Sequence, residues 1–275
     1  MQAIAALRDA LRRDPALHAA HTLLWSALDG AGAAPAAITA LKSELLAVWH
    51  ASPTVPASAN PVEIEHTTLL VLDHANHALA QRTLALCLAG CRFEHVKWLT
   101  GRAITVPGVE TILTAPILSH ADYSRFMVKD LLAYVDTDHV LVAQWDGHVV
   151  NPAAWSAEFL LFDYIGARWD NALHRRSAHH NVGNGGFSLR SRALLEALQD
   201  PVIEVTHAED VTICRQYRSY LEERHGIVFA PDDIADRFAF EYLEPPSMPF
   251  GFHSVSNLAR FVGAPGWATL DFYFR

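Results

Sequence analysis

The sequence is poor in cysteine, in net positive charge and in long apolar runs. Its three cysteines cannot form a disulfide framework. Cys87 and Cys91, four positions apart in a segment with a helical pattern, are expected to be buried thiols on one helix face. The formal net charge of -9 argues against binding to a nucleic-acid polymer, which requires a basic surface. A nucleotide is not excluded, because a metal ion can neutralise its diphosphate.

No apolar run in the sequence is long enough to cross a bilayer. Residues 1–14 alternate arginine with acid and alanine, and they lack the apolar segment and cleavage site of a signal peptide. We therefore expect a cytoplasmic enzyme that is not integral to a membrane. Apolar residues make up 51% of the 275 residues, which is enough for a sizeable core in one large α/β domain.

Residues 1–52 are rich in alanine and leucine, and their apolar positions recur at helical spacing. The pattern predicts three short amphipathic helices and resembles a degenerate tetratricopeptide-type helical pair. Because no clear second repeat follows, we expect a small helical appendage that offers a surface to a protein partner, rather than a peptide-binding solenoid. Residues 53–65 carry three prolines and are expected to form a linker.

Strand and helix patterns alternate from residue 66 onward. Strands are predicted at 67–72, at 95–99 and from 139 to the acid at 146, and a helix is predicted over 75–90. A capping box at residues 119–122 predicts the start of a further helix. This alternation implies right-handed βαβ units, so residues 66–275 are predicted to form an α/β domain with a mainly parallel sheet.

The last of these strands is a continuous apolar run that stops at Asp146 and Gly147. Such a run is typical of a buried parallel strand, and ligands of open α/β sheets bind at the carboxyl ends of these strands. Asp146 is therefore a candidate ligand-binding residue. The alternative is that Asp146 and Gly147 form an ordinary turn after a strand.

Four segments together resemble a known group of proteins. They are Gln-Trp-Asp-Gly (144–147), Phe-Asp-Tyr-Ile-Gly-Ala-Arg-Trp (162–169), Val-Gly-Asn-Gly-Gly-Phe-Ser-Leu-Arg (182–190) and Phe-Gly-Phe-His (250–253). Their order is similar to that of an uncharacterised bacterial and fungal domain family grouped with GT-A-type glycosyltransferases. The resemblance implies a GT-A-like, Rossmann-type α/β fold, with a mixed, mainly parallel sheet flanked by helices and a nucleotide-sugar site.

The resemblance also implies a metal site. In GT-A enzymes an Asp-x-Asp turn holds a divalent ion that clamps the donor diphosphate, and a histidine near the C-terminus often contributes a ligand. Here the turn has only its last acid, so Asp146 and His253 would bind Mn²⁺ or Mg²⁺, with Gln144 beside them. The alternative for His253 is a structural histidine in an aromatic segment.

Thr206 and Glu209 match a second capping box, which predicts a helix that ends at Gly226. By resemblance to inverting GT-A enzymes, a carboxylate at this helix start would be the general base that takes the proton of the acceptor hydroxyl. Asp210 is the first candidate, because the cap already accounts for Glu209, and Glu209 is the reserve.

The resemblance further assigns residues to two parts of a donor pocket. The nucleotide is expected to lie against residues that follow two of the strands: Asp73, His74, Asn76, Gln144, Trp145 and Asp146. The donor sugar is expected to lie against residues of the second and third segments: Asp163, Tyr164, Trp169, Asn184, Gly185 and Gly186. The alternatives are that Tyr164 and Trp169 are core aromatics and that the glycine loop is a bulged hairpin corner.

These features predict a metal-dependent glycosyltransferase. It would move a sugar from UDP or another nucleoside diphosphate to a hydroxyl of a glycan, a lipid-linked molecule or a small molecule, with inversion favoured. Two other functions fit the same sequence. One is a catalytically silent module that keeps the fold and recruits partners, and the other is a nucleotide-sugar hydrolase that uses water as the acceptor.

Overall fold

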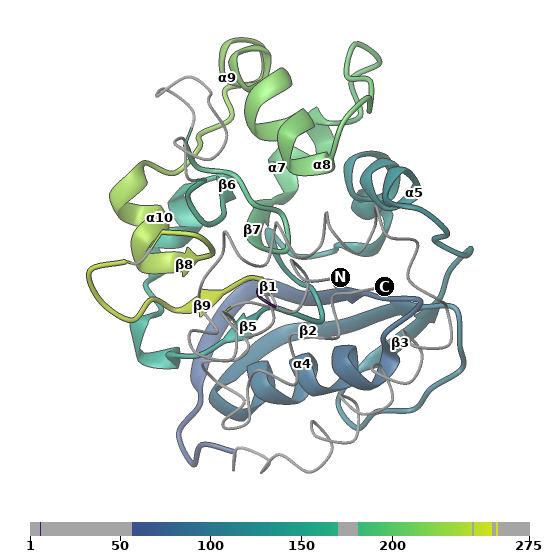
Figure 1. Ribbon diagram of the computed structural model, residues 1–275, viewed down its shortest axis with the longest axis vertical. Helices are drawn as coiled ribbons and strands as arrows, with labels where there is room; N and C mark the ends of the chain where they lie inside the picture. Colours follow the sequence, from purple (N-terminus) through teal and green to yellow (C-terminus); the bar gives the residue numbers. More distant parts are fainter. Residues whose placement is uncertain (1–5, 7–56, 170–180, 244, 255–256, 258–275) are drawn as a thin grey trace. The chain divides into compact units, whose positions relative to one another are not determined.

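The computed structural model describes residues 6, 57–169, 181–243, 245–254 and 257, which are drawn in colour in Figure 1. Apart from Ala6, which is helical, the helices predicted over residues 1–52 lie outside this part of the chain. Contacts between Cα atoms group residues 56–253 into one compact unit. The α/β architecture starts earlier than expected, because the first strand begins at Val62, inside the predicted linker.

A six-stranded sheet forms the centre of this unit. Its strands, in spatial order, are β3 (Glu110–Leu113), β2 (Cys91–Thr100), β1 (Val62–Leu72), β4 (His139–Ala143), β7 (Phe187–Ser191) and β6 (Tyr164–Ile165). The first four strands run parallel, while β7 is antiparallel to both β4 and β6. The predicted mixed, mainly parallel α/β sheet is therefore confirmed.

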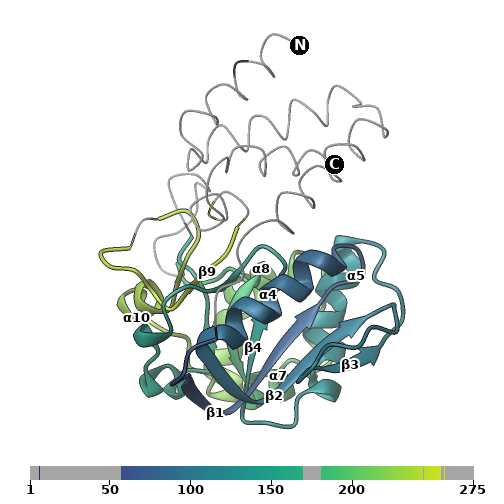
Figure 2. The ribbon, with the colours of Figure 1, turned by 90° about the horizontal axis from the view of Figure 1, so that it is seen from below.

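Helices cover both faces of the sheet, and this explains why all five residues of β4 are buried and why four of them are apolar. Leu141 and Ala143 pack on the face that carries α4 (His77–Gly90) and α10 (Asp232–Phe238). Val140 and Val142 pack on the opposite face, against a second group of helices. These are α5 (His120–Arg125), α7 (Arg192–Ala197) and α9 (Arg218–His225). Figures 1 and 2 show α4 lying along β1 and β2.

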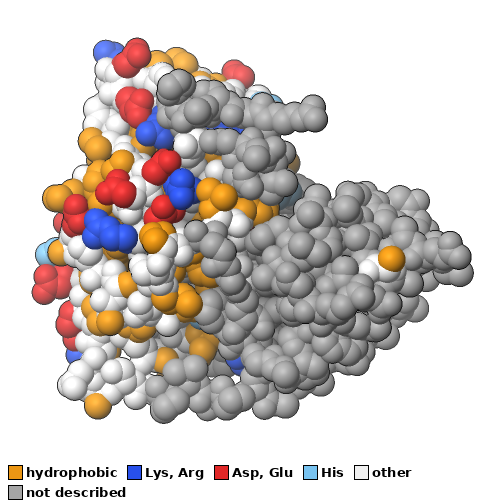
Figure 3. Space-filling view, turned by 60° about the vertical axis from the view of Figure 1, so that its left-hand side comes forward, with side chains coloured by type: hydrophobic (Ala, Val, Ile, Leu, Met, Phe, Trp, Pro, Cys, Tyr) orange, Lys and Arg blue, Asp and Glu red, His pale blue; other side chains and the backbone are white. Residues whose placement is uncertain are grey.

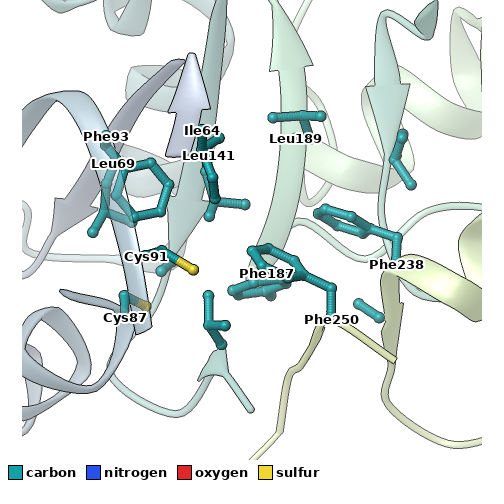
Figure 4. Close-up of a cluster of buried hydrophobic side chains, with 14 of the residues drawn as sticks. Ile64, Leu69, Cys87, Cys91, Phe93, Leu141, Phe187, Leu189, Phe238 and Phe250 are labelled. Carbon is teal, nitrogen blue, oxygen red and sulfur yellow. The ribbon is translucent and has the colours of Figure 1, made fainter. Parts of the chain in front are cut away.

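A cluster of aromatic rings closes the core on the face of α4 and α10. Phe187 of β7 lies 5.4 Å from Phe238 and 6.0 Å from Phe250, measured between ring centroids, and all three side chains are buried (Figure 4). Burial of each such side chain contributes about 1.5–3 kcal/mol to folding. The same cluster includes Cys87 and Cys91. The prediction that both thiols share a helix face is wrong, because α4 ends at Gly90 and Cys91 is the first residue of β2.

A second, three-stranded sheet joins segments that are distant in the sequence. Its order is β5 (His148–Val149), β9 (Gly251–Phe252) and β8 (Ala239–Phe240). β9 pairs antiparallel with β5 and parallel with β8, and the His253 amide donates to the Phe240 carbonyl at 3.0 Å. Because β5 begins two residues after Asp146, this sheet brings the C-terminal segment to the end of β4.

Helix starts and ends follow local sequence in some places and not in others. The Ser119 side chain accepts from the Asp122 amide at 3.0 Å, which confirms the predicted cap of α5, and Gly226 ends α9 with a φ of 70°. The second capping box is wrong, since α8 (Glu209–Val211) has Ala208 at its N-cap and no side-chain cap bond. The remaining short segments are η1 (Phe126–Asp130), η2 (Leu131–Tyr134), η3 (Pro152–Ala154), η4 (Ala157–Leu161) and η5 (Thr212–Gln216).

None of the helices in the described part of the chain is both long and apolar enough to span a membrane. The surface of the same part is mixed in charge. Figure 3 shows acidic and basic side chains beside one another on one face. Ion pairs such as Arg237 with Glu158, at 2.6 Å, are typical of this surface.

Candidate functional site

The strand order identifies one edge of the large sheet as the place where a ligand would bind. The chain runs outward from β1 through β2 to β3 and then returns to β4 on the other side of β1. Ligands of open α/β sheets bind outside the carboxyl ends of the strands where the order reverses in this way. Leu70 pairs with Val142, so Asp73 and Asp146 follow their strands at this same edge.

Asp146 and His253 meet at this edge. The Nε2 atom of His253 lies 3.2 Å from the Oδ1 atom of Asp146, and both side chains are largely buried. Gly147 makes the approach possible, because a Cβ atom there would lie 2.7 Å from the carbonyl oxygen of Phe252. The structure therefore places the two predicted metal ligands in direct contact, and their role as ligands stays a prediction.

Three further side chains surround the imidazole of His253. The Nε2 atom also lies 3.2 Å from Oε1 of Gln144, whose amide nitrogen donates to the Tyr123 hydroxyl at 2.8 Å. On the other side of the ring, Nδ1 lies 3.3 Å from Oε1 of Glu241 and 3.1 Å from Nδ2 of Asn184. Burial by itself lowers the pKa of His253, but the charges and hydrogen bonds of Asp146 and Glu241 raise it well above its usual value.

Glu241 is the residue of this group that the sequence did not reveal. It is 6% exposed and follows β8, and its Oε2 atom accepts from Nδ2 of Asn184 at 2.6 Å. No motif surrounds it. The sequence signal that could have indicated it is an acid that directly follows a short apolar segment, because such an acid is costly to bury without a partner.

The glycine loop lies against the imidazole. Asn184 has a φ of 52°, in the left-handed region that asparagine tolerates better than most residues. Its Oδ1 atom accepts from the Gly186 amide at 3.2 Å. A Cβ atom on Gly186 would lie 2.1 Å from Nε2 of His253, so the loop backbone approaches the ring as closely as only glycine allows.

A buried ion pair between Arg190 and Glu209 supports the glycine loop from the protein interior. Arg190 is fully buried and donates through Nη2 to both carboxylate oxygens of Glu209, at 3.0 Å each, and to the Gly185 carbonyl at 3.3 Å. Burial raises the pKa of Glu209 to about 7, although Arg190 acts in the opposite direction. Glu209 therefore points into the protein toward Arg190 instead of capping its helix, and this is the physical reason for the missing capping box.

Asp210 lies on the other side of the same loop. Its Oδ2 atom accepts from the Gly185 amide at 3.3 Å, and its Oδ1 atom accepts from the Val211 amide at 2.7 Å. The side chain is half-buried. Among the described residues, a buried arginine thus pairs with Glu209 and not with Asp210.

The residues predicted to hold the nucleotide lie at the same edge, and several also have local roles. Asp73 is 8% exposed, and its Oδ1 atom accepts from the amides of Ala75 and Asn76, at 2.9 and 2.5 Å. His74 contacts the Thr114 hydroxyl through Nε2 at 3.0 Å. Trp145 is half-buried beside Gln144.

Two of the residues predicted to contact the donor sugar do not belong to this site. Asp163 bonds to the Ser191 hydroxyl at 2.5 Å, and Ser191 pairs with His139, at the start of β4 and the opposite edge of the sheet from Asp146. Tyr164 is fully buried in the core, under the guanidinium of Arg190. The structure therefore does not bring either side chain to His253, because the antiparallel pairing of β6 with β7 directs this segment away from it.

Trp169 has a supporting position. Its ring is 6% exposed, lies under the guanidinium of Arg215 at 3.9 Å and fills the space next to Gly183. It thus packs against the start of the glycine loop. Asn184, Gly185 and Gly186 are the predicted sugar-pocket residues that the structure does bring to His253.

The side chains present fit a divalent cation with few protein ligands. Within the described ranges, no group of three or more His, Cys, Asp or Glu side chains is arranged to hold a metal. However, Oδ1 of Asp146 is buried and faces Nε2 of His253. Adjacent ligands of an octahedral cation are about 3 Å apart, because each lies about 2.1 Å from the metal. The 3.2 Å between Asp146 and His253 matches that spacing.

Comparison with known proteins gives one family match and distant likenesses of fold. The family model described as "Protein of unknown function (DUF5672)" matches residues 108–253, which include Asp146, the glycine loop, Glu241 and His253. No protein of curated function matches the sequence.

Two solved structures have a similar fold. One is a galactosyltransferase, LgtC, in complex with donor and acceptor sugar analogues. It is 14% identical with a TM-score of 0.46, over 75% of this chain and 95% of that one. The other is the mannosyltransferase PcManGT from Pyrobaculum calidifontis in complex with GDP-Man and Mn²⁺. It is 12% identical with a TM-score of 0.43, over 72% of this chain and 65% of that one. Likenesses at this level concern the fold, so function has to be argued from the site itself.

Proposed function

The chain belongs to the protein family DUF5672, and we propose that it is a metal-dependent glycosyltransferase that moves a sugar from a nucleoside diphosphate to an acceptor hydroxyl. The observation that carries this proposal is the contact between Asp146 and His253, at the edge where the strand order reverses and beside the glycine loop. A carboxylate, an imidazole and closely approaching backbone at this edge suit a metal-bound diphosphate better than an uncharged ligand.

The charge of the site supports a cation between protein and donor. Asp146, Glu241 and Asp210 all lie near His253 or the loop that contacts it. These carboxylates would repel a bare diphosphate. Asp146 and His253 are the residues that would hold Mn²⁺ or Mg²⁺, with the Gln144 carbonyl beside them, and a bound cation would neutralise the charge of the departing diphosphate.

The residues around the loop account for the remaining steps. Asp210 would take the proton of the acceptor hydroxyl, since its carboxylate lies at the loop and no buried arginine in the described part of the chain pairs with it. Glu209 is a weaker candidate, because both of its oxygens accept from Arg190. The backbone of Asn184, Gly185 and Gly186 would border the sugar, where the absence of Cβ atoms permits close approach.

The test is an assay of the full-length protein with Mn²⁺ and a panel of UDP- and GDP-sugars. Release of the nucleoside diphosphate that requires an acceptor supports a transferase. Release in water alone, with free sugar as the product, indicates a hydrolase instead. Binding without turnover of any donor indicates a silent binding module.

The variant D146A tests the metal site by calorimetry. We expect Mn²⁺-dependent donor binding to be lost. The matched control is Asp136→Ala, whose exposed carboxylate pairs with Lys97 and precedes the start of β4. Unchanged donor affinity in D146A would refute the assignment.

A further inference from the structure

The two atoms that face Nδ1 of His253 have opposite hydrogen-bonding character. Oε1 of Glu241, at 3.3 Å, can only accept a hydrogen bond when the carboxylate is ionised, whereas Nδ2 of Asn184, at 3.1 Å, can only donate one. The orientation of the Asn184 amide is fixed, because its oxygen accepts from the Gly186 amide and its nitrogen donates to Oε2 of Glu241. In a neutral imidazole, Nδ1 can therefore either donate to Glu241 or accept from Asn184, but it cannot do both.

That choice decides which ring nitrogen can bind a metal. If Nδ1 donates to Glu241, the lone pair of a neutral ring lies on Nε2, next to Oδ1 of Asp146. If Nδ1 accepts from Asn184, the proton lies on Nε2, where it blocks a cation. A carboxylate that accepts from the outer nitrogen of a histidine ligand fixes the ring in the first state.

We propose that Glu241 is a positioning residue that holds His253 with its Nδ1 proton toward Glu241 and its Nε2 lone pair toward the cation between His253 and Asp146. The inference rests on the proposed function and adds to it a residue that no motif contains. Glu241 is suited to this role because it is buried, accepts from Asn184 at 2.6 Å and also bonds to the Tyr242 hydroxyl, so the carboxylate has little freedom to turn away.

The position of Glu241 makes the role specific. It follows β8, and His253 follows the neighbouring strand β9, whose residues Gly251 and Phe252 pair with Ala239 and Phe240. The carboxylate and the imidazole thus leave adjacent parallel strands at the same level. This pairing holds the two side chains in register without help from the metal.

The test compares wild type with E241Q and E241A, using the full chain. Mn²⁺ affinity is measured by calorimetry and by the electron paramagnetic resonance signal of free Mn²⁺. We expect each variant to bind Mn²⁺ about 10–100-fold more weakly than wild type. The control is Glu158→Gln, which makes the same chemical change in an exposed pair with Arg237 and should bind Mn²⁺ as wild type does.

A second readout does not need the metal. Nitrogen-15 spectra of histidine-labelled protein report which ring nitrogen carries a proton, and the H253N variant assigns the signals. The spectra are recorded at a pH high enough to leave the ring neutral, because Asp146 and Glu241 raise the pKa of His253. There we expect the single ring proton to lie on Nδ1 in wild type and on Nε2 in E241A, because Asn184 is then the remaining partner of Nδ1 among these two residues. E241Q keeps the side-chain volume and serves for the affinity measurement if E241A does not fold.

The outcomes separate this inference from the proposed function. If wild type binds no Mn²⁺, the metal-dependent function and the role of Glu241 both fail. If wild type binds Mn²⁺ and both variants bind it within twofold of wild type, the role of Glu241 alone is refuted. A neutral ring in E241A whose single proton stays on Nδ1 refutes it as well.

Discussion

Arg190 donates to both carboxylate oxygens of Glu209 in the interior of the protein, at 3.0 Å each, directly beside the Gly185 carbonyl. The pair explains two features of the site at once. It turns Glu209 away from the helix start that the sequence predicted for it, and it supports the loop that contacts His253. A Cβ atom on Gly185 would lie 1.6 Å from Oε1 of Glu209, so loop and ion pair fit each other closely.

Breaking this buried ion pair should lower the free energy of unfolding more than breaking an exposed ion pair. We expect Glu209→Ala to lower the free energy of unfolding by about 3–5 kcal/mol, because the Arg190 charge would be left buried without its partner. The control is Glu196→Ala, which breaks an exposed pair with Arg192 and should cost less than about 1 kcal/mol. Urea unfolding measures both. Equal losses in the two variants would contradict the buried pairing.

Stability should depend on pH through His253. Because Asp146 and Glu241 raise the pKa of His253 well above 6.5 in the folded state, the protonated ring stabilises the fold fully below that value. The stabilisation is lost as the pH rises through the folded-state pKa. We therefore expect the difference in unfolding free energy between wild type and H253N to be larger at about pH 6 than at about pH 9. A difference that stays constant or grows with pH would contradict this.

Gly186→Ala should disrupt the site without changing any charged group. The new Cβ atom would lie 2.1 Å from Nε2 of His253, so the ring and the loop cannot keep their present positions relative to each other. We expect Mn²⁺ affinity to fall by about tenfold or more, as expected for a displaced ligand. Gly226→Ala is the control: its φ of 70° makes the substitution costly for stability, but no atom of the described residues lies within 4 Å of the new Cβ. Calorimetry should show normal Mn²⁺ binding for that control.

Asp163 should matter for stability and not for ligand binding. Its carboxylate accepts from the Ser191 hydroxyl and from the Val228 amide, at 2.5 and 2.8 Å. We expect Asp163→Ala to cost about 1–3 kcal/mol, because these donors lose their acceptor. Donor affinity of the folded variant should stay within about twofold of wild type. A loss of donor binding without a loss of stability would contradict this and show that Asp163 contributes to the donor site.

Features with a local cause could be predicted from the sequence. The apolar run of β4 predicts a strand covered on both faces, and helices do cover both. The Ser119 cap depends on residues three positions apart, and it forms as expected. The contact between Asp146 and His253 could be predicted as well, because the end of the strand and the order of the motifs indicated one edge of the sheet.

Features with a distant cause could not be predicted. Glu241 reaches His253 through the pairing of β8 with β9, two strands of two residues each, which leave no periodic pattern in the sequence. Glu209 matched a local capping pattern, yet a buried arginine on β7 provides a stronger partner. Asp163 shares a motif-rich segment with residues near the loop, but the antiparallel pairing of β6 places it at the far edge.

The brevity of β9 has a consequence for how the site comes together. The two residues of β9 fix the position of His253 along the sheet. Their pairing with β8 fixes Glu241 at the matching position of the neighbouring strand. Fraying of this small sheet would therefore displace the imidazole of His253 and the carboxylate of Glu241 together, while the six-stranded sheet stays intact. Exchange of the His253 amide hydrogen, which bonds to the Phe240 carbonyl, thus reports how often the protein is without its site.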